Sequence, residues 1–174
     1  MMQDFSFVHK YFMAEKQAGL LFLIIGSVAV LLSVVFFFFI KSNPSFYKGM
    51  AVPLIVIGLL QLVVGVAVFN RSDKQRMDVS YKIGMDPGFV KNTEQPRMEK
   101  VQQNFTIYKY AEIALLIAGI VLIILYRANA DKSFWYGLGI ALAIQSIICL
   151  SADIVAAKRG EMYLNKLKEI GNHK

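Results

Sequence analysis

Four long apolar runs dominate the sequence and restrict what the chain can fold into. None of them contains Lys or Arg, and they cover residues 19–40, 50–70, 110–126 and 133–157. About 20 helical residues cross the roughly 30 Å apolar core of a bilayer. Three runs reach that length, and the third reaches it when it begins near Phe105. We therefore predict an all-α polytopic membrane protein with four transmembrane helices.

Composition and pattern exclude other classes of protein. Hydrophobic residues make up 56% of the chain, above the roughly 45–50% apolar content of soluble domains. The runs are continuously apolar, whereas the strands of a β-barrel alternate every second residue. The first run is longer than the roughly 7–15 apolar residues of a signal peptide, and no small-residue cleavage site follows it. We expect it to remain as a helix.

The distribution of basic residues predicts the orientation. Of the 19 Lys and Arg residues, the connections after the first and third runs carry only Lys41, Lys48, Arg127 and Lys132, so 19 − 4 = 15 lie on the other side. Positive charge stays cytoplasmic during insertion. Both termini are therefore expected in the cytoplasm, most simply at a bacterial inner membrane. Anionic lipid of the inner leaflet accounts for the net charge of +7, so no nucleic acid is expected as a partner.

The chain also contains a candidate internal duplication. Residues 45–49 (SFYKG) align with residues 133–137 (SFWYG) at an offset of 88. Upstream the best offset drifts to 93 and pairs Gly26 with Gly119, so the first outer loop is expected to be five residues longer. Two spans per copy predict a parallel repeat, related by an axis along the membrane normal.

This organisation gives one membrane domain over residues 1–174. It divides into a first hairpin (1–71), a cytoplasmic helical connection (72–104) and a second hairpin (105–174). Residues 84–88 contain Gly and Pro and should break the connection, and a new helix should start near Pro96.

Apolar side chains at helical spacing continue beyond the runs. They are Met77, Tyr81 and Ile83 after the second run, Met98, Val101, Phe105 and Tyr108 before the third, and Met162, Leu164, Leu167 and Ile170 after the fourth. Phe5, Val8, Tyr11 and Phe12 predict a short helix lying on the inner leaflet. We expect the stripes to pack on each other, and a docking surface for a soluble partner is the alternative.

Ionisable residues inside the apolar runs are candidates for a functional site. Glu112 and Asp153 lie within the third and fourth spans, where the first hairpin has Gly19 and Gly65. In one reading each carboxylate reaches the headgroups or pairs with a basic residue, namely Lys109, Lys158 or Arg159. In the other, the two carboxylates approach each other and bind a cation, a proton or a polar ligand. Gln61 and Gln145 are expected to form hydrogen bonds between helices.

No catalytic, metal-binding or cofactor-binding motif is present in the sequence. Cys149 is the single cysteine, so it cannot form an intramolecular disulfide. The favoured hypothesis is a non-enzymatic membrane protein that acts by association, as a subunit, scaffold or immunity-type modulator, with a protein partner or as a homo-oligomer. The alternative is a small oligomeric transporter or pore with Glu112 and Asp153 on its path. A lipid-modifying membrane enzyme is the third hypothesis.

Overall fold

Four long helices account for nearly all of the computed structural model, which describes residues 6–86 and 88–172. A short π-helical segment, η1, precedes the third long helix, and a 3₁₀ turn, η2, precedes the fourth. All four helices are long and apolar enough to cross a membrane, which confirms the predicted all-α class and helix number. The elements are α1 (Ser6–Phe38), α2 (Pro44–Met85), η1 (Val90–Glu94), α3 (Gln95–Tyr126), η2 (Ala130–Lys132) and α4 (Ser133–Asn172).

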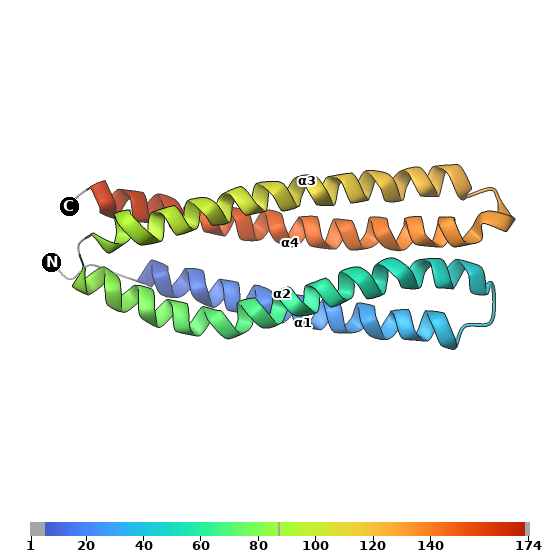
Figure 1. Cartoon of the computed structure of the whole chain (residues 1–174), viewed down its shortest axis with the longest axis horizontal. Helices are drawn as coiled ribbons and strands as arrows, with labels where there is room; N and C mark the ends of the chain where they lie inside the picture. The colour runs from blue at the N-terminus through green and yellow to red at the C-terminus, as the bar shows by residue number, and fades with distance from the viewer. Residues whose placement is uncertain (1–5, 87, 173–174) are drawn as a thin grey trace.

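The helices form two antiparallel hairpins that lie side by side (Figure 1). α1 packs on α2, α3 packs on α4, and the hairpins meet mainly through α2 and α4. The connections 39–43 and 127–132 lie at one end, called here the loop end. The other end, called the polar end, carries the beginning of α1, the end of α4 and the turn between α2 and η1.

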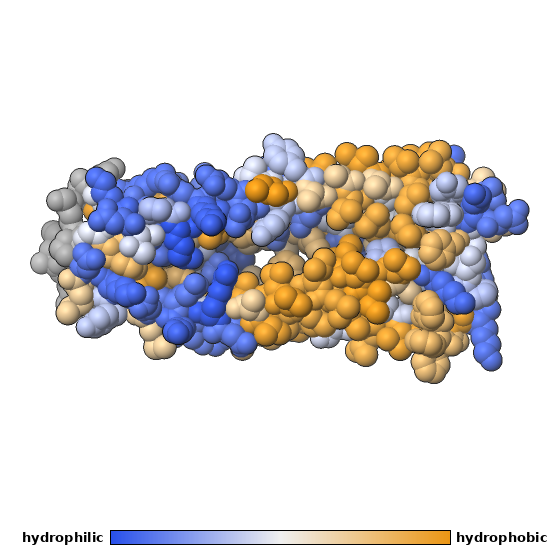
Figure 2. Space-filling view, in the orientation of Figure 1, coloured by the Kyte–Doolittle hydropathy of each residue, from blue (hydrophilic) through white to orange (hydrophobic). Residues whose placement is uncertain are grey.

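Hydropathy divides the bundle along its length. Figure 2 shows an apolar belt over the half nearer the loop end and a mostly polar surface over the other half. Large apolar side chains in the belt face outwards, including Leu31, Val63 and Ile124, which are 66%, 68% and 60% exposed. Such exposure is unfavourable in water and suits a lipid environment.

Small residues bring the helix backbones of each hairpin together inside the belt. A Cβ on Gly26 would lie 2.7 Å from the carbonyl oxygen of Gly58, and one on Gly119 would lie 2.9 Å from that of Gly139. These distances are too short for a real side chain, so glycine is required. Close approach of this kind is how helices associate in lipid, where no hydrophobic force acts between them.

The same contacts correct the predicted register of the first hairpin. At the offset of 88, Gly139 corresponds to Ala51, whereas Gly26 packs against Gly58. The two predicted offsets, 93 upstream and 88 downstream, therefore do not both hold. The longer first loop is wrong, because residues 39–43 join α1 to α2 and residues 127–132 join α3 to α4. Runs of Leu, Ile and Val align well at several offsets, so the sequence did not discriminate between them.

Two reciprocal contacts join the hairpins near the loop end. A Cβ on Gly49 of α2 would collide with the carbonyl oxygen of Phe134, and one on Gly137 of α4 would collide with the carbonyl oxygen of Phe46. The rings of Phe46 and Tyr136 lie against each other there, with centroids 5.7 Å apart. These contacts hold the loop-end halves of α2 and α4 backbone against backbone.

Replacing Gly137 tests this contact. Gly137→Ala should lower the free energy of unfolding by about 1–3 kcal/mol, because the new methyl group meets a backbone carbonyl that cannot move aside. Gly84→Ala is the control, since a Cβ there meets no atom within 4 Å and alanine favours the helix. Thermal unfolding in detergent measures both variants. Equal melting temperatures for the two variants would contradict the proposed close contact.

At the polar end all four helices close on a common apolar core. Its most buried members are Val8 and Phe12 of α1, Ile83 of α2, Met98 of α3 and Leu167 of α4, each at most 1% exposed. The predicted stripes pack on one another in part: Ile83, Met98, Val101, Leu164, Leu167 and Ile170 lie in or against this core, whereas Tyr108 and Met162 are 52% and 56% exposed. The predicted break also occurs, because α2 ends at Met85 and α3 restarts with proline in its first turn.

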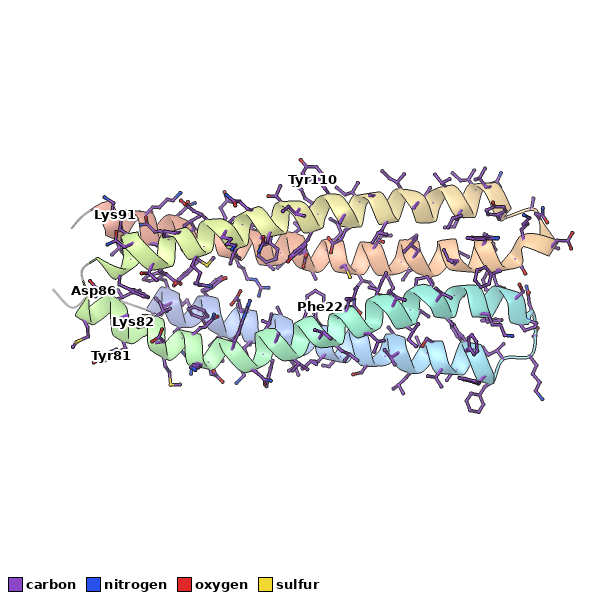
Figure 3. All side chains as sticks on the ribbon, viewed as in Figure 1. Phe22, Tyr81, Lys82, Asp86, Lys91 and Tyr110 are labelled. Carbon is purple, nitrogen blue, oxygen red and sulfur yellow. The ribbon has the colours of Figure 1, made fainter. Side chains whose placement is uncertain are left out.

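Two details of the polar end differ from expectation. Residues 6–12 begin α1, and Val8, Tyr11 and Phe12 are buried in the bundle, so the predicted short helix on the inner leaflet is wrong; Phe5 lies outside the described residues. On α2, Met77 and Tyr81 are 62% and 66% exposed, whereas Val79 and Ile83 face the core. Figure 3 shows Tyr81 pointing away from the bundle. Two faces of α2 carry apolar residues four positions apart. Met77, Tyr81 and Met85 lie on one face, and Val79 and Ile83 lie on the other, which is the face that packs into the core.

A buried charge in the polar-end core was not predicted. Glu94 is 1% exposed, and the Nε and Nη2 atoms of Arg97 donate to its two oxygens at 2.8 and 2.7 Å. The Tyr163 hydroxyl donates to Glu94 Oε1 at 2.9 Å. The ring of Tyr163 stacks on the ring of Tyr11, with centroids 4.2 Å apart. Burial and the Glu94 carboxylate raise the pKa of Tyr163, which keeps this phenol a donor. The network joins α1, α3 and α4.

Removing Arg97 should destabilise the protein far more than removing a surface charge. Arg97→Ala leaves the Glu94 carboxylate buried without its cation, which costs about 3–5 kcal/mol. Lys166→Ala is the control, because the Lys166–Glu169 pair is exposed and such pairs contribute at most about 1 kcal/mol. Chemical unfolding measures the free energy of unfolding of both variants. Similar losses of stability would show that burial of the Glu94 carboxylate does not depend on Arg97.

Candidate functional site

Three helices bring polar side chains to one level of the apolar belt. α2 contributes Gln61, α3 contributes Glu112, and α4 contributes Gln145, Cys149 and Asp153. The α4 residues are spaced four apart, so they share one face of the helix. The four predicted site residues are therefore placed near one another, together with a cysteine that was not predicted to take part.

Helix register explains why these residues are level. Gly119 lies against Ala143, and α3 and α4 are antiparallel. Seven residues back from 119 is 112, and seven onward from 143 is 150, so Glu112 lies opposite the stretch between Cys149 and Asp153. Glu112 is fourteen residues from the end of α3 at Tyr126, or about 21 Å at 1.5 Å per residue. Glu112 is also seventeen residues from the start of α3 at Gln95, so the site lies near the middle of the bundle.

Gln61 and Gln145 form the interhelical hydrogen bond expected of them. The Gln61 Nε2 group donates to Gln145 Oε1 at 3.4 Å and to Cys149 Sγ at 3.2 Å. Gln61 and Gln145 are 3% and 2% exposed. The 3.4 Å distance to Gln145 indicates a weak hydrogen bond, and Gln61 Oε1 has no partner among the described residues, so the amide group of Gln61 is held at the α4 surface without being fully satisfied.

The carboxyl groups of Glu112 and Asp153 lie within range of each other, as charges and as a hydrogen-bonding pair. Both side chains are half-buried between α3 and α4. Cys149, one turn along α4 from Asp153, lies within electrostatic range of both. The two carboxylates that the sequence singled out thus approach each other from adjacent helices.

Several buried oxygens around this level have no hydrogen-bond partner among the described residues. They include Glu112 Oε2, Gln61 Oε1 and Ser146 Oγ. Ser146 is 2% exposed and follows Gln145 on α4. Unsatisfied polar groups cost several kcal/mol each in the apolar core of a bilayer. Oxygens gathered at this level are suited to a ligand that donates hydrogen bonds or carries positive charge.

The basic residues considered as partners do not neutralise the pair. Within residues 6–86 and 88–172, neither Glu112 nor Asp153 forms an ion pair with Lys109, Lys158 or Arg159. Lys109 lies over the ring of Tyr110 at 5.6 Å. Arg159 instead donates to the carbonyl oxygen of Ala14 on α1 at 3.0 Å. The negative charge of the pair is therefore not cancelled by a direct protein cation in this part of the chain.

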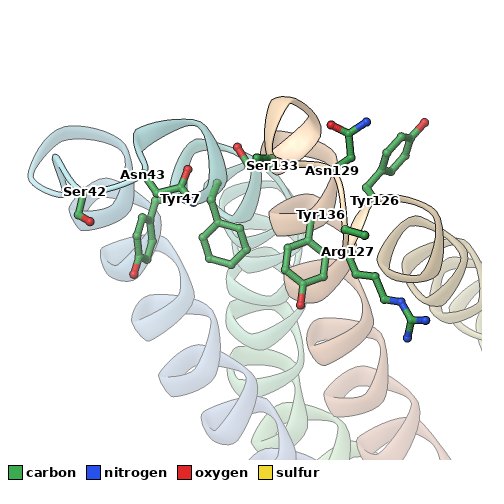
Figure 4. Close-up of a pocket in the computed structure, with 11 residues that line it drawn as sticks. Ser42, Asn43, Tyr47, Tyr126, Arg127, Asn129, Ser133 and Tyr136 are labelled. Atoms are coloured by element: carbon green, nitrogen blue, oxygen red, sulfur yellow. The ribbon is translucent and has the colours of Figure 1, made fainter.

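Two hollows open on the surface of the described part of the bundle, one between helices and one at the loop end. A groove of about 330 Å³ between α3 and α4 reaches Asp153 from the polar side, and its charged and amide lining residues are Gln102, Lys109, Asp153, Lys158 and Glu161. A hollow of about 490 Å³ lies at the loop end, beneath the two connections, and is lined by residues such as Tyr47, Arg127 and Tyr136 (Figure 4). The loop-end hollow contains none of the predicted site residues.

Sequence reasoning missed Cys149 and Ser146, although one signal pointed to Cys149. This residue lies four positions after Gln145, four before Asp153, and 88 after Gln61. A single thiol was set aside because it could not form a disulfide. The described residues contain no group of three or more His, Cys, Asp and Glu placed to hold a metal ion.

Comparison with known proteins gives no significant match. No family model, no characterised protein and no solved structure is similar to this chain.

Proposed function

We propose that this protein is a small membrane transporter that binds a proton or a small monovalent cation at Glu112 and Asp153. The observation that carries the proposal is the group of buried oxygens inside the apolar belt, of which Glu112 Oε2, Gln61 Oε1 and Ser146 Oγ have no partner among the described residues. A polar group left unsatisfied in a membrane is a cost that a bound ligand removes.

The chemistry of the site favours a single positive charge. Two carboxylates that share a site resist ionising together, and one proton or cation between them relieves the repulsion. Gln61 Oε1 and Ser146 Oγ, on α2 and α4, are neutral oxygens, which suit hard cations and hydrogen-bond donors. Cys149 adds a thiol at the edge of the site.

The contacts of Gln61 with Gln145 and Cys149 place part of the site between the hairpins, which also supports transport. Transporters built from repeats place their ligand site at the repeat interface. We propose that the two hairpins are duplicates at a constant offset of 88. The contacts of Gly49 with Phe134 and of Gly137 with Phe46 are reciprocal at that offset, and so is the Gln61–Cys149 pair. Reciprocal contacts of this kind arise across a two-fold axis.

Glu112→Gln tests the role of the carboxylate directly, because it keeps the shape of the side chain and removes its charge. In proteoliposomes under an imposed gradient, the variant should lose proton flux, or sodium flux where sodium is the ligand, by at least about tenfold. Proton flux is followed with a trapped pH-sensitive dye, and sodium flux with a sodium-sensitive dye. Expression and oligomeric state should remain those of the wild type.

Glu99→Gln is the matched control, because Glu99 is exposed at the polar end and pairs with Lys168 at 3.0 Å on the surface. It should carry the wild-type flux. The proposal fails if wild-type vesicles conduct no more than empty ones, or if the Glu112→Gln protein conducts as well as the wild type.

Association with a partner is the second candidate function, and one observation favours it. Met77, Tyr81 and Met85 form an exposed stripe on α2 at the polar end, at 62%, 66% and 68% exposure. Methionine-rich surfaces adapt readily to partners. If the protein acts by association, Tyr81→Glu should weaken binding of the partner and Glu112→Gln should leave it unchanged. If the protein is a transporter, Glu112→Gln should reduce flux and Tyr81→Glu should leave it unchanged.

We further propose that the polar end faces the cytoplasm of a bacterial cell, where its basic residues meet anionic lipid. Cysteines introduced at Asn43, in the loop end, should react with a membrane-impermeant thiol reagent added outside intact cells. Cysteines at Asn92, in η1, should react only after permeabilisation. Wild-type protein corrects for the reaction of Cys149, and outside labelling at position 92 would reverse the assignment.

A further inference from the structure

We propose that this structure is the state of the transporter that is open to the polar end, in which the carboxylate pair exchanges its ligand through the groove between α3 and α4 and the bundle is closed towards the loop end. This inference rests on the proposed function and adds the side from which the site is loaded. It follows from where the groove ends and from how tightly the helices pack beyond the site.

The groove connects the pair to the polar end. Asp153 belongs both to the pair and to the lining of the groove, which continues along Ala157 and Glu161 of α4 and along Thr106 and Gln102 of α3. Its volume of about 330 Å³ holds several water molecules at about 30 Å³ each. A hydrated path therefore reaches Asp153 without crossing the apolar belt.

The lining of the groove is compatible with a moving positive charge. Lys109 and Lys158 contribute two positive charges, and Asp153 and Glu161 contribute two negative charges. The net charge along the path is therefore close to zero. Gln102 holds one wall in place, because its Nε2 group donates to the carbonyl oxygen of Ala157 at 3.0 Å.

Beyond the site, towards the loop end, the helix backbones touch. Two turns from Glu112, a Cβ on Gly119 would lie 2.8 Å from the Ala143 backbone nitrogen, and farther on a Cβ on Gly139 would lie 2.8 Å from the Gly119 carbonyl oxygen. Farther on, Gly49 and Gly137 bring α2 and α4 into backbone contact. At these points no water fits between the backbones, which supports closure between the site and the loop-end hollow.

Blocking the groove in the folded protein tests the inference. A cysteine introduced at Ala157 is modified, after purification and reconstitution, with a bulky thiol reagent, and flux is compared before and after modification. Modification should slow the flux at least about tenfold, because the adduct fills the groove beside Asp153 without altering the pair. Performing the modification after folding removes the risk that a bulky substitution prevents assembly.

Ala128→Cys provides the matched control, since Ala128 lines the loop-end hollow. Its modification should leave flux unchanged, and wild-type protein treated with the same reagent corrects for Cys149. Flux that persists after modification at 157, or that falls after modification at 128, overturns the access route while leaving the proposed function intact. Absence of flux from the unmodified wild type overturns the proposed function, and the route with it.

Discussion

The close approach of helix backbones at glycine is the constraint on which the rest of this bundle depends. Lipid provides no hydrophobic force between apolar helices, so their association relies on packing and on buried polar contacts. Gly26 against Gly58 and Gly119 against Gly139 fix the register within each hairpin, and Gly49 and Gly137 fix it between hairpins. A side chain at any of these positions would separate backbones that now touch.

This register determines which polar groups meet. With α3 held against α4 at Gly119, Glu112 reaches the stretch of α4 that carries Asp153. With α2 held against α4, Gln61 reaches Cys149 and Gln145. The polar-end core, closed by the Glu94 network, holds the other ends of the helices together. The polar site therefore lies between the glycine contacts and the polar-end core. A change in helix packing at this level would alter access to the site.

The sequence predicted those features that depend on local composition. The apolar runs defined four helices, the Gly and Pro residues at 84–88 located the break, and Glu112 stood out as a charge within an apolar run. The features that it did not predict depend on which faces meet in three dimensions. Glu94 lies in a polar stretch and becomes buried only because Arg97 and Tyr163 surround it. Val79 and Met77 are both apolar residues of α2, and the packing of the four helices alone decides that Val79 is buried in the core and Met77 is exposed.

We propose that Glu112 and Asp153 hold one exchangeable positive charge inside the membrane. Infrared spectroscopy of the protein in lipid measures this directly, through the carbonyl band of a protonated carboxylic acid in sodium-free buffer. We expect a band that disappears when the pH is raised or a competing cation is added, and that is missing from the Glu112→Gln/Asp153→Asn double variant. A wild-type spectrum without this band, or a double variant that retains it, would show that the pair holds no such charge.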